Sequence, residues 1–284
     1  MGKVIPLALC LLAAVSGETV EEKETIRRTF RLAQPSAAKR VEVDNLNGSI
    51  RVAGTSGGDV ELIAHQTISA ESKEKVQQAR QEVKLEIEQR DNTVSLLVDG
   101  PFRCKCGDGS INFRGWHHYG YKVRYDFELK VPQDAGLYLR TVNDGEIKVE
   151  NVFGDYDIEN INGGIEMLEA AGSGRAYALN GKLMVLFRKN PQSASYFGSL
   201  NGPVDLLFQP DLSADLRVKT FNGKIYSDFP VTYLPPAAPQ QERRNGKFVF
   251  KADRFAGARV GKGGPEIKLD GFNGDIRIRQ RGSD

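Results

Sequence analysis

The sequence has few of the residues on which most enzymes and metalloproteins depend. It holds 3 Cys, 3 His and 1 Trp in 284 residues, and Cys10 lies in an N-terminal apolar run. The other two cysteines cannot build a cystine-stabilised scaffold, and a chain of this length can bury a core without one. His65, His117 and His118 offer little material for a hydrolytic triad, and no Gly-X-Ser-X-Gly motif precedes a helix. We therefore predict a protein that is not an enzyme and needs no cofactor.

An excess of charge of one sign is also missing. The chain has 39 Lys and Arg against 37 Asp and Glu, and without Lys3 near the N-terminus the balance is 39 − 1 = 38 against 37. A nearly neutral surface does not attract phosphates of nucleic acid or anionic headgroups over long range. The composition therefore argues against a nucleic-acid partner.

Long apolar runs are absent apart from one at the N-terminus, residues 4–15. That run of about twelve residues is too short to span a bilayer but has the length of a signal-peptide core. Lys3 precedes it and small residues lead to a cleavage site after Ser16. We predict a signal peptide over 1–16, an N-terminal segment over 17–39, and an exported protein, periplasmic or secreted, without a membrane span. The alternative is an N-terminal anchor or a buried strand.

The sequence is rich in a repeated strand–turn–strand pattern. Seven segments share it, with their turns at Asn47-Gly48, Asn143-Asp144-Gly145, Asn162-Gly163, Asn180-Gly181, Asn201-Gly202, Asn222-Gly223 and Asn273-Gly274. From the second to the sixth, the Asn residues are 19, 18, 21 and 21 positions apart. Apolar and polar residues alternate on both sides of each turn, which is typical of strands with one buried face. Gly after Asn allows the chain to turn sharply.

The nearly constant period decides between two folds. One Asn-Gly between alternating strands normally predicts an antiparallel hairpin, whereas units of about 20 residues favour rungs that stack on one another. We predict an all-β protein, a single parallel β-solenoid domain over 40–284 with one short surface helix; an antiparallel β-sandwich or meander is the alternative. The Asn side chains then either stack into a hydrogen-bonded ladder or serve turn geometry alone. The residues two positions after each turn glycine should be buried and in register: Ile147, Ile165, Leu183, Val204, Ile225 and Ile276.

Two segments interrupt the repeats. Residues 59–131 form a non-repeat region, with strands expected at 59–68, 83–88, 93–98 and 121–131 and a glycine-rich loop at 99–120. Residues 70–82 contain strong helix formers and no Gly or Pro, which predicts the surface helix. Four prolines between positions 230 and 239 predict a second loop over 230–246.

The glycine-rich loop carries the only unusual cluster of chemistry-bearing residues. Cys104 and Cys106 precede His117 and His118, and two thiolates with two imidazoles could hold zinc, although the spacing is that of no known zinc finger. A disulfide between the two cysteines is the competing fate of exported thiols, and free or intermolecular thiols are the third option.

Aromatic residues flank the two histidines of this loop. Trp116, Tyr119 and Tyr121 could form a sugar-stacking surface or cap the open end of a core. The segment lies between strands and supplies no Asn-Gly turn. We therefore expect that removal of residues 102–121 leaves the repeats folded.

Three stretches together resemble a known family. They are Val-Pro-Gln-Asp-Ala-Gly-Leu-Tyr-Leu at 131–139, the series of Asn-Gly repeats, and the glycine-rich tail at 261–276. In these the chain resembles the bacterial DUF4097 family of adhesin-domain proteins, over about residues 40–279. The resemblance implies an envelope-associated or secreted β-solenoid with roles in adhesion or envelope stress.

Two hypotheses on function follow. The first is an adhesin-like, non-catalytic scaffold that presents a flat face to an envelope protein or a polysaccharide. The second is a carbohydrate-binding or polysaccharide-active protein on the same fold. Exposed acidic side chains beside aromatic rings on one face would favour the second hypothesis, and a face of mixed charges without aromatics would favour the first.

Overall fold

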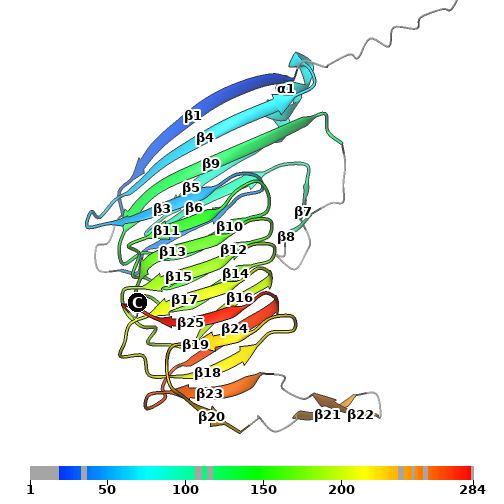
Figure 1. The fold of residues 1–284 in the computed structure, drawn as a ribbon. Coiled ribbons are helices and arrows are strands. Elements are labelled where there is room, and N and C mark those ends of the chain that lie inside the picture. The colour runs from blue at the N-terminus through cyan, green and yellow to red at the C-terminus, as the bar shows by residue number, and fades with distance from the viewer. Residues whose placement is uncertain are drawn as a thin grey trace, which may run out of the picture.

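The computed structural model describes residues 19–32, 37–105, 111–113, 118–235, 240–244, 247–251 and 255–282. These residues form two large β-sheets that face each other across one hydrophobic core, with one helix, α1 (Lys73–Glu82), at one end (Figure 1). The prediction of an all-β protein with one short helix is confirmed. The expected signal peptide lies outside the described residues. Within them, no helix has the length and apolar character that a membrane span requires.

Sheet A has ten strands. In spatial order they are β1 (Val20–Phe30), β4 (Val60–Ala70), β9 (Tyr121–Pro132), β3 (Ile50–Thr55), β11 (Ile147–Glu150), β13 (Ile165–Ala170), β15 (Leu183–Phe187), β17 (Val204–Phe208), β25 (Ile276–Gln280) and β19 (Ile225–Ser227).

Sheet B has eleven strands. From the same end they are β5 (Lys84–Arg90), β6 (Thr93–Asp99), β2 (Arg40–Asp44), β10 (Gly136–Thr141), β12 (Tyr156–Asn160), β14 (Gly174–Ala178), β16 (Ser195–Asn201), β24 (Glu266–Asn273), β18 (Ala214–Lys219), β23 (Ala256–Val260) and β20 (Val231–Leu234). Two small hairpins, β7 (Arg103–Lys105) with β8 (Ile111–Phe113) and β21 (Gln240–Arg244) with β22 (Lys247–Lys251), stand apart from both sheets.

Each Asn-Gly turn connects a strand of sheet B to a strand of sheet A. β12 and β13 flank Asn162-Gly163 and do not pair with each other. β12 instead pairs in parallel with β10 and β14, and β13 pairs in parallel with β11 and β15. The turns therefore do not close antiparallel hairpins, because the strands on either side belong to opposite layers of the core.

The predicted register of the core positions is confirmed. Ile147, Ile165, Leu183, Val204, Ile276 and Ile225 are aligned as successive partners across sheet A. All except Ile225 are buried, and the prediction that Ile225 is buried is wrong: it is 45% exposed. The reason is its place in the fold, since β19 is the last strand of sheet A and only one side of it is covered.

The repeats do not stack in the order of the sequence. The C-terminal repeat, β24 with β25, lies between the fifth repeat, β16 with β17, and the sixth, β18 with β19. β24 pairs in parallel with both β16 and β18, and β25 pairs in parallel with both β17 and β19. The last segment of the chain is therefore an interior level of the stack.

The asparagines of the turns form a continuous hydrogen-bonded ladder. The amide of Asn47 donates to the Val123 carbonyl, and each of the other side-chain amides donates to the amide oxygen of the asparagine stacked next to it. The bonds run Asn143 to Asn47 (3.3 Å), Asn162 to Asn143 (2.8 Å), Asn180 to Asn162 (2.9 Å), Asn201 to Asn180 (2.7 Å), Asn273 to Asn201 (2.7 Å) and Asn222 to Asn273 (2.9 Å). The asparagines thus do more than set turn geometry, and the ladder follows the spatial order of the repeats, with Asn273 between Asn201 and Asn222.

A second row of polar side chains lies inside this corner. The residue two positions before the turn asparagine has a short polar side chain in most repeats, and it binds the carbonyl of a turn glycine. Asn160 donates to the carbonyls of Gly145 and Gly164, and Ser199 donates to that of Gly181 (2.9 Å). These bonds satisfy the carbonyl groups of glycines at the turn, which point away from both sheets.

The turn glycines are required because neighbouring backbones come very close. A Cβ atom at any of them would lie between 2.0 and 2.3 Å from a backbone atom stacked beside it: Gly48, Gly145, Gly163, Gly181, Gly202, Gly223 and Gly274. Real Cβ contacts are never this short, so a side chain would push two levels of the stack apart.

We expect Gly181→Ala to destabilise the protein by about 3 kcal/mol or more, at the upper end of overpacking effects, because its Cβ would lie 2.3 Å from the Gly163 carbonyl oxygen. Gly58→Ala is the control, since a Cβ at Gly58 meets nothing within 4 Å, and it should change stability by less than about 0.5 kcal/mol. Urea unfolding of both variants measures the difference. Equal stability would show that the turns can widen without cost.

Antiparallel strands close the upper end of the stack. β9 pairs in parallel with β3, and β4 and β1 follow as antiparallel strands. Ser72 caps helix α1 by accepting from the Lys75 backbone N–H, and Val76 and Ala79 bury one face of the helix. Sheet A thus begins in the segment that the sequence suggests is a separate N-terminal piece.

The predicted loops contain strands. Residues 99–120 include β7 and β8, and residues 230–246 include β20 and β21. The prolines do not prevent formation of strand β20, because Pro230 and Pro235 lie directly outside it.

Candidate binding face

The cysteine and histidine cluster cannot be assembled from the described residues. Cys104 lies in β7, with its backbone opposite Asn112, while Cys106 and His117 lie outside the described residues. Nε2 of His118 is 2.7 Å from Oε1 of Glu71. Among the described residues, no group of three or more His, Cys, Asp or Glu could hold a metal ion. The zinc site and the Cys104–Cys106 disulfide stay predictions.

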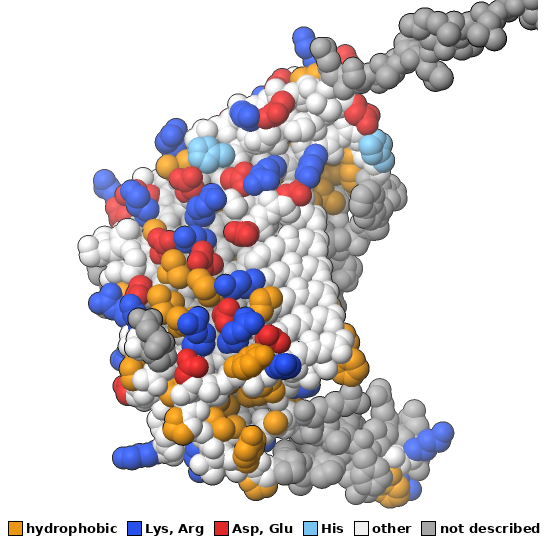
Figure 2. Space-filling model, viewed as in Figure 1, with side chains coloured by type: hydrophobic (Ala, Val, Ile, Leu, Met, Phe, Trp, Pro, Cys, Tyr) orange, Lys and Arg blue, Asp and Glu red, His pale blue; other side chains and the backbone are white. Residues whose placement is uncertain are grey.

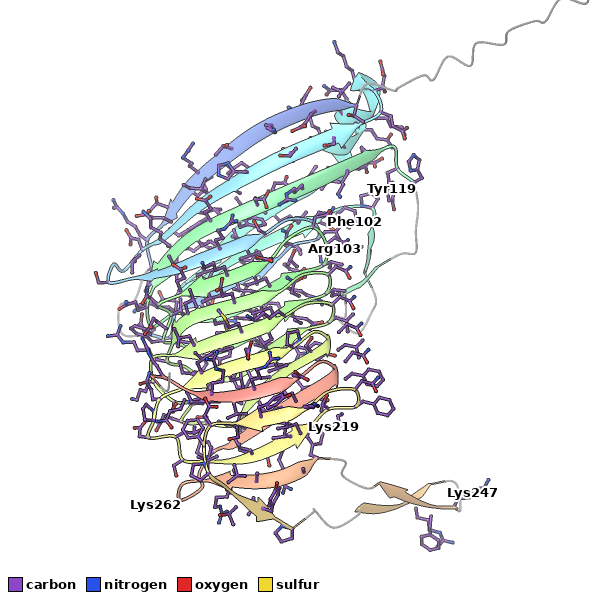
Figure 3. All side chains as sticks on the ribbon, in the orientation of Figure 1. Phe102, Arg103, Tyr119, Lys219, Lys247 and Lys262 are labelled. Atoms are coloured by element: carbon purple, nitrogen blue, oxygen red, sulfur yellow. The ribbon has the colours of Figure 1, made fainter. Side chains whose placement is uncertain are left out.

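The start of the glycine-rich segment is firmly attached to the body. The guanidinium of Arg103 makes two bonds of 3.0 Å to the Asp44 carboxylate and a third, of 2.6 Å, to the Val98 carbonyl. The Arg103 and Asp44 side chains are only 5% and 12% exposed. Phe102 packs against the core. Figure 3 shows Phe102 and Arg103 next to the main sheets. The expectation that residues 102–121 are dispensable therefore does not fit their contacts.

The aromatic residues at the end of this segment serve the fold. The rings of Tyr119 and Tyr121 lie 5.6 Å apart. The Tyr121 hydroxyl donates to Glu82 at the end of α1, and burial followed by this bond raises the pKa of Tyr121. Tyr121 therefore ties β9 to the helix, and Trp116 lies outside the described residues.

The outer face of sheet B brings together tyrosines, basic residues and carboxylates. Parallel register aligns its outward side chains in two rows that cross the strands. One row is Glu42, Tyr138, Asp157, Arg175, Tyr196, Lys268 and Arg217. The other row is Asp44, Arg140, Glu159, Tyr177, Gly198, Asp270 and Lys219.

Two tyrosine rings form the centre of this face. The rings of Tyr177 and Tyr196 lie 6.3 Å apart and are tilted by 40°. Tyr177 leans over Gly198, where a Cβ atom would lie 3.0 Å from the ring. The absence of a side chain at Gly198 thus gives the ring room to lie across the sheet and present its side to solvent.

Arg175 holds the two rings and two carboxylates together. Its Nη1 lies 3.3 Å from Asp157 Oδ1 and 3.1 Å from Glu159 Oε2. Its guanidinium carbon is 5.3 Å from the ring centre of Tyr177 and 5.9 Å from that of Tyr196, within the range of cation–π attraction. Burial works against the charged form, but Glu159 and Asp157 outweigh it and raise the pKa of Arg175. The cation is therefore permanent and fixed in position.

A second set of bonds anchors the other side of the ring pair. The Tyr196 hydroxyl donates to Asp270 Oδ2 at 3.2 Å, and Lys219 Nζ lies 2.8 Å from Asp270 Oδ1. Burial first, and then the charge of Asp270, raise the pKa values of both Tyr196 and Tyr177. Both hydroxyls therefore remain protonated donors near neutral pH.

A third aromatic ring extends the face toward β23. Phe255 lies beneath two ammonium groups, with Lys268 Nζ 4.2 Å and Lys219 Nζ 4.7 Å from its ring centre. Lys219, labelled in Figure 3, projects from the end of β18. Aromatic rings, cations and carboxylates thus alternate over neighbouring strands.

The outer face of sheet A has a different composition. Charged residues of both signs cover β4, β9, β3 and β11, with apolar side chains between them further along the stack (Figure 2). Leu168, Leu186 and Leu207 supply outward apolar positions on successive strands. Over its described strands, this face carries mixed charges without a pair of neighbouring tyrosine rings.

The sequence contains the signal for the candidate face, although the repeat alignment alone does not reveal it. Tyr177 and Tyr196 occupy outward positions of their strands, and only the register between repeats shows that they are neighbours. An alignment of the polar positions, in addition to the buried ones, would have placed them on one surface.

Comparisons with known proteins find only distant similarities. No family model matches the chain, and no curated protein matches it. A solved structure from Clostridium sporogenes, provisionally described as a cell adhesion protein, is 12% identical, with a TM-score of 0.40 over 93% of this chain and 100% of that one. One from Bacteroides fragilis, provisionally described as an adhesin, is 11% identical, with a TM-score of 0.31 over 90% and 97%.

A third solved structure has a different description. It comes from Parabacteroides distasonis, is provisionally described as a lipid-binding protein, and is 11% identical, with a TM-score of 0.29 over 89% of this chain and 96% of that one. Identity and structural overlap at this level do not identify a family.

Proposed function

We propose that this chain is a non-catalytic, adhesin-like binding protein that holds a polysaccharide on the outer face of sheet B. The observation that carries the proposal is the Tyr177–Tyr196 pair with Arg175 and Asp270 around it. Within the same proposal, the two facing sheets are a β-solenoid related to the DUF4097 proteins that the sequence resembles. The protein acts in the cell envelope after export, in the periplasm or outside the cell.

The chemistry of the face suits sugars. The C–H faces of a sugar ring are apolar and pack on aromatic rings, while its hydroxyls both donate and accept hydrogen bonds. Arg175 and Lys219 supply donors on either side of the tyrosines, and Asp157, Glu159 and Asp270 supply acceptors. A face with donors and acceptors beside two neighbouring tyrosine rings matches a polymer of hydroxylated rings better than an apolar partner.

The carboxylates of this face support binding rather than catalysis. Asp157 and Glu159 are both paired with Arg175, and Asp270 is paired with Lys219 and Tyr196. A glycosidase needs one carboxyl group that gives up a proton and a second that attacks or activates water. These carboxylates already bind cations of the same face, so the proposal assigns them to hydroxyl recognition.

We expect Tyr177→Ala and Arg175→Ala each to weaken polysaccharide binding about tenfold or more, as loss of a central aromatic or arginine contact does. Arg277→Ala on sheet A is the matched control: Arg277 is 40% exposed and paired with Asp275 and Asp205, as Arg175 is 39% exposed and paired with two acids. Affinity electrophoresis against a panel of neutral and anionic polysaccharides, and assay of new reducing ends, provide the measurements.

Three outcomes would contradict the proposal. They are failure of every polysaccharide to retard the wild-type protein, equal loss in the Arg175 and Arg277 variants, and release of reducing ends. Capture of a protein through the same tyrosines would assign the face to a protein partner instead, since Tyr and Arg also dominate protein interfaces.

A further inference from the structure

The two sheets end at different levels at the lower end of the stack. β18 of sheet B and β19 of sheet A form the last shared level, joined through the Asn222-Gly223 turn. Sheet B continues with β23 and β20, both antiparallel to their neighbours. Within the described part of the chain, sheet A supplies no strand opposite these two, so the lower end of the core is a ledge two strands wide.

Apolar side chains line this ledge where the opposite layer is missing. Tyr233 is aligned with Ala258 on β23, which is aligned with the fully buried Leu216 on β18. Directly paired residues point to the same side of a sheet, so Tyr233 faces the core side, yet it is 82% exposed. Ile225 on β19 occupies a core position and is also exposed.

The edge strand at the ledge is short, but it carries neither a charged side chain nor proline. β19 consists of Ile225, Tyr226 and Ser227, with no charge and no proline. At the opposite edge of sheet A, β1 has the sequence Val-Glu-Glu-Lys-Glu-Thr-Ile-Arg-Arg-Thr-Phe, which is rich in charge. Natural sheets protect exposed edges with charged side chains, with proline or by keeping the edge strand very short. β19 has only the last of these protections, and its composition is compatible with pairing to a further strand.

The chain itself contains an element of matching size. Between β20 and β23 it forms the antiparallel hairpin β21–β22, whose strands pair with each other and with no other described strand. β22 reads Lys-Phe-Val-Phe-Lys, and Phe248 on it is exposed. The hairpin lies to one side of the lower end of the body, with Lys247 on the side away from the sheets (Figures 1 and 3). It is a two-stranded arm beside a ledge that lacks two strands.

We propose that two copies of this chain exchange these arms. The β21–β22 hairpin of each copy docks on the ledge of the other, continues sheet A beyond β19 and covers Ile225 and Tyr233. Because each copy gives one arm and receives one, the contact is reciprocal and closes as a two-fold dimer, which is the usual outcome of exchanging identical elements. A second copy suits the ledge better than the same copy, because among the described strands β21 and β22 pair only with each other and leave the ledge of their own chain open. This inference is independent of the polysaccharide proposal.

Light scattering on the full mature chain tests the exchange. We expect a dimer for the wild type and monomers for two variants: one in which Gly and Ser replace residues 240–251, and one with Ile225→Lys. Met184→Lys, which adds the same charge on the outer face of sheet A, is the control and should stay dimeric. Thermal melting of each variant confirms that it is folded.

A mixing experiment makes the test specific for exchange. The arm-replaced chain keeps an intact ledge, and the Ile225→Lys chain keeps an intact arm, so the two monomers should associate 1:1 when mixed. A monomeric wild type, a dimer that survives arm replacement, or variants that fail to associate on mixing would each overturn the proposal.

Discussion

Ending the chain after Gly264 should unfold the protein instead of shortening it by one repeat. In most repeat proteins each unit contacts only its sequence neighbours, so loss of the last unit costs one end of the array. Here the last unit lies between two others, and without it β16 and β17 have no partner on one side and β18 and β19 have lost the strands to which they are joined.

The expected loss is comparable to the stability of a whole domain. The truncation removes four buried side chains: Ile267, Leu269, Ile276 and Ile278. At about 1.5–3 kcal/mol each they contribute about 6–12 kcal/mol, against a total of about 5–15 kcal/mol for a typical domain. The break in the asparagine ladder at Asn273 adds to this loss.

Near-UV circular dichroism and hydrogen exchange measure the effect. The control is a chain that starts after the edge strand β1, at residue 33. It should lose protection only in β4 and the adjacent helix α1 and keep a cooperative transition, because β1 pairs with β4 alone and bonds to α1 through Glu22 and Arg80. Persistent protection of β16 and β18 in the chain that ends at Gly264 would show that the fifth and sixth repeats can close on each other.

Arg103→Ala should be the most destabilising exchange of a charged residue. It leaves the Asp44 carboxylate in a site where that side chain is only 12% exposed, and loss of one partner of a buried ion pair typically costs about 3–5 kcal/mol. Arg259→Ala is the control, because Arg259 makes similar paired bonds to Asp215 (2.7 and 2.9 Å) but is 43% exposed. An exposed pair of this kind contributes at most about 1 kcal/mol.

Urea unfolding of both variants gives the comparison. A double variant, Arg103→Met with Asp44→Leu, should recover most of the stability, since it leaves no uncompensated charge. Equal effects of Arg103→Ala and Arg259→Ala would mean that water reaches Asp44 in the native protein.

The sequence predicts the repeating part of the fold because its local signals agree with one another. In the third repeat Asn162 marks the turn, Gly163 allows the close approach of backbones, and Ile165 takes the core position, and the structure has all three. The spatial order of the repeats, in contrast, could not be predicted from local signals. Asn201, Asn222 and Asn273 have similar surroundings in sequence, and nothing local states that Asn273 lies between the other two. The exposure of Ile225 follows from that long-range choice and could not be predicted from its repeat.

The candidate face depends on the same kind of information. Tyr177, Tyr196 and Asp270 lie on three different strands, β14, β16 and β24, and the register of parallel pairing brings them together. Outward positions carry no hydrophobic period that would mark them. The glycine-rich segment shows the opposite error, because its composition suggests a free loop while Arg103 forms a buried ion pair.

The interleaved repeat also has a consequence in time. Asn222 and its ladder partner Asn273 are 51 residues apart, so at typical rates of synthesis the ribosome needs about 3 to 10 s to add the second after the first. During that interval the nascent chain has a complete sixth repeat that must stay away from the fifth, or the place of the seventh is lost. A protein that folded as it was made would risk that misassembly. A protein that stays unfolded until the whole chain is released would avoid that risk. This topology is therefore better suited to folding after release than to folding during synthesis.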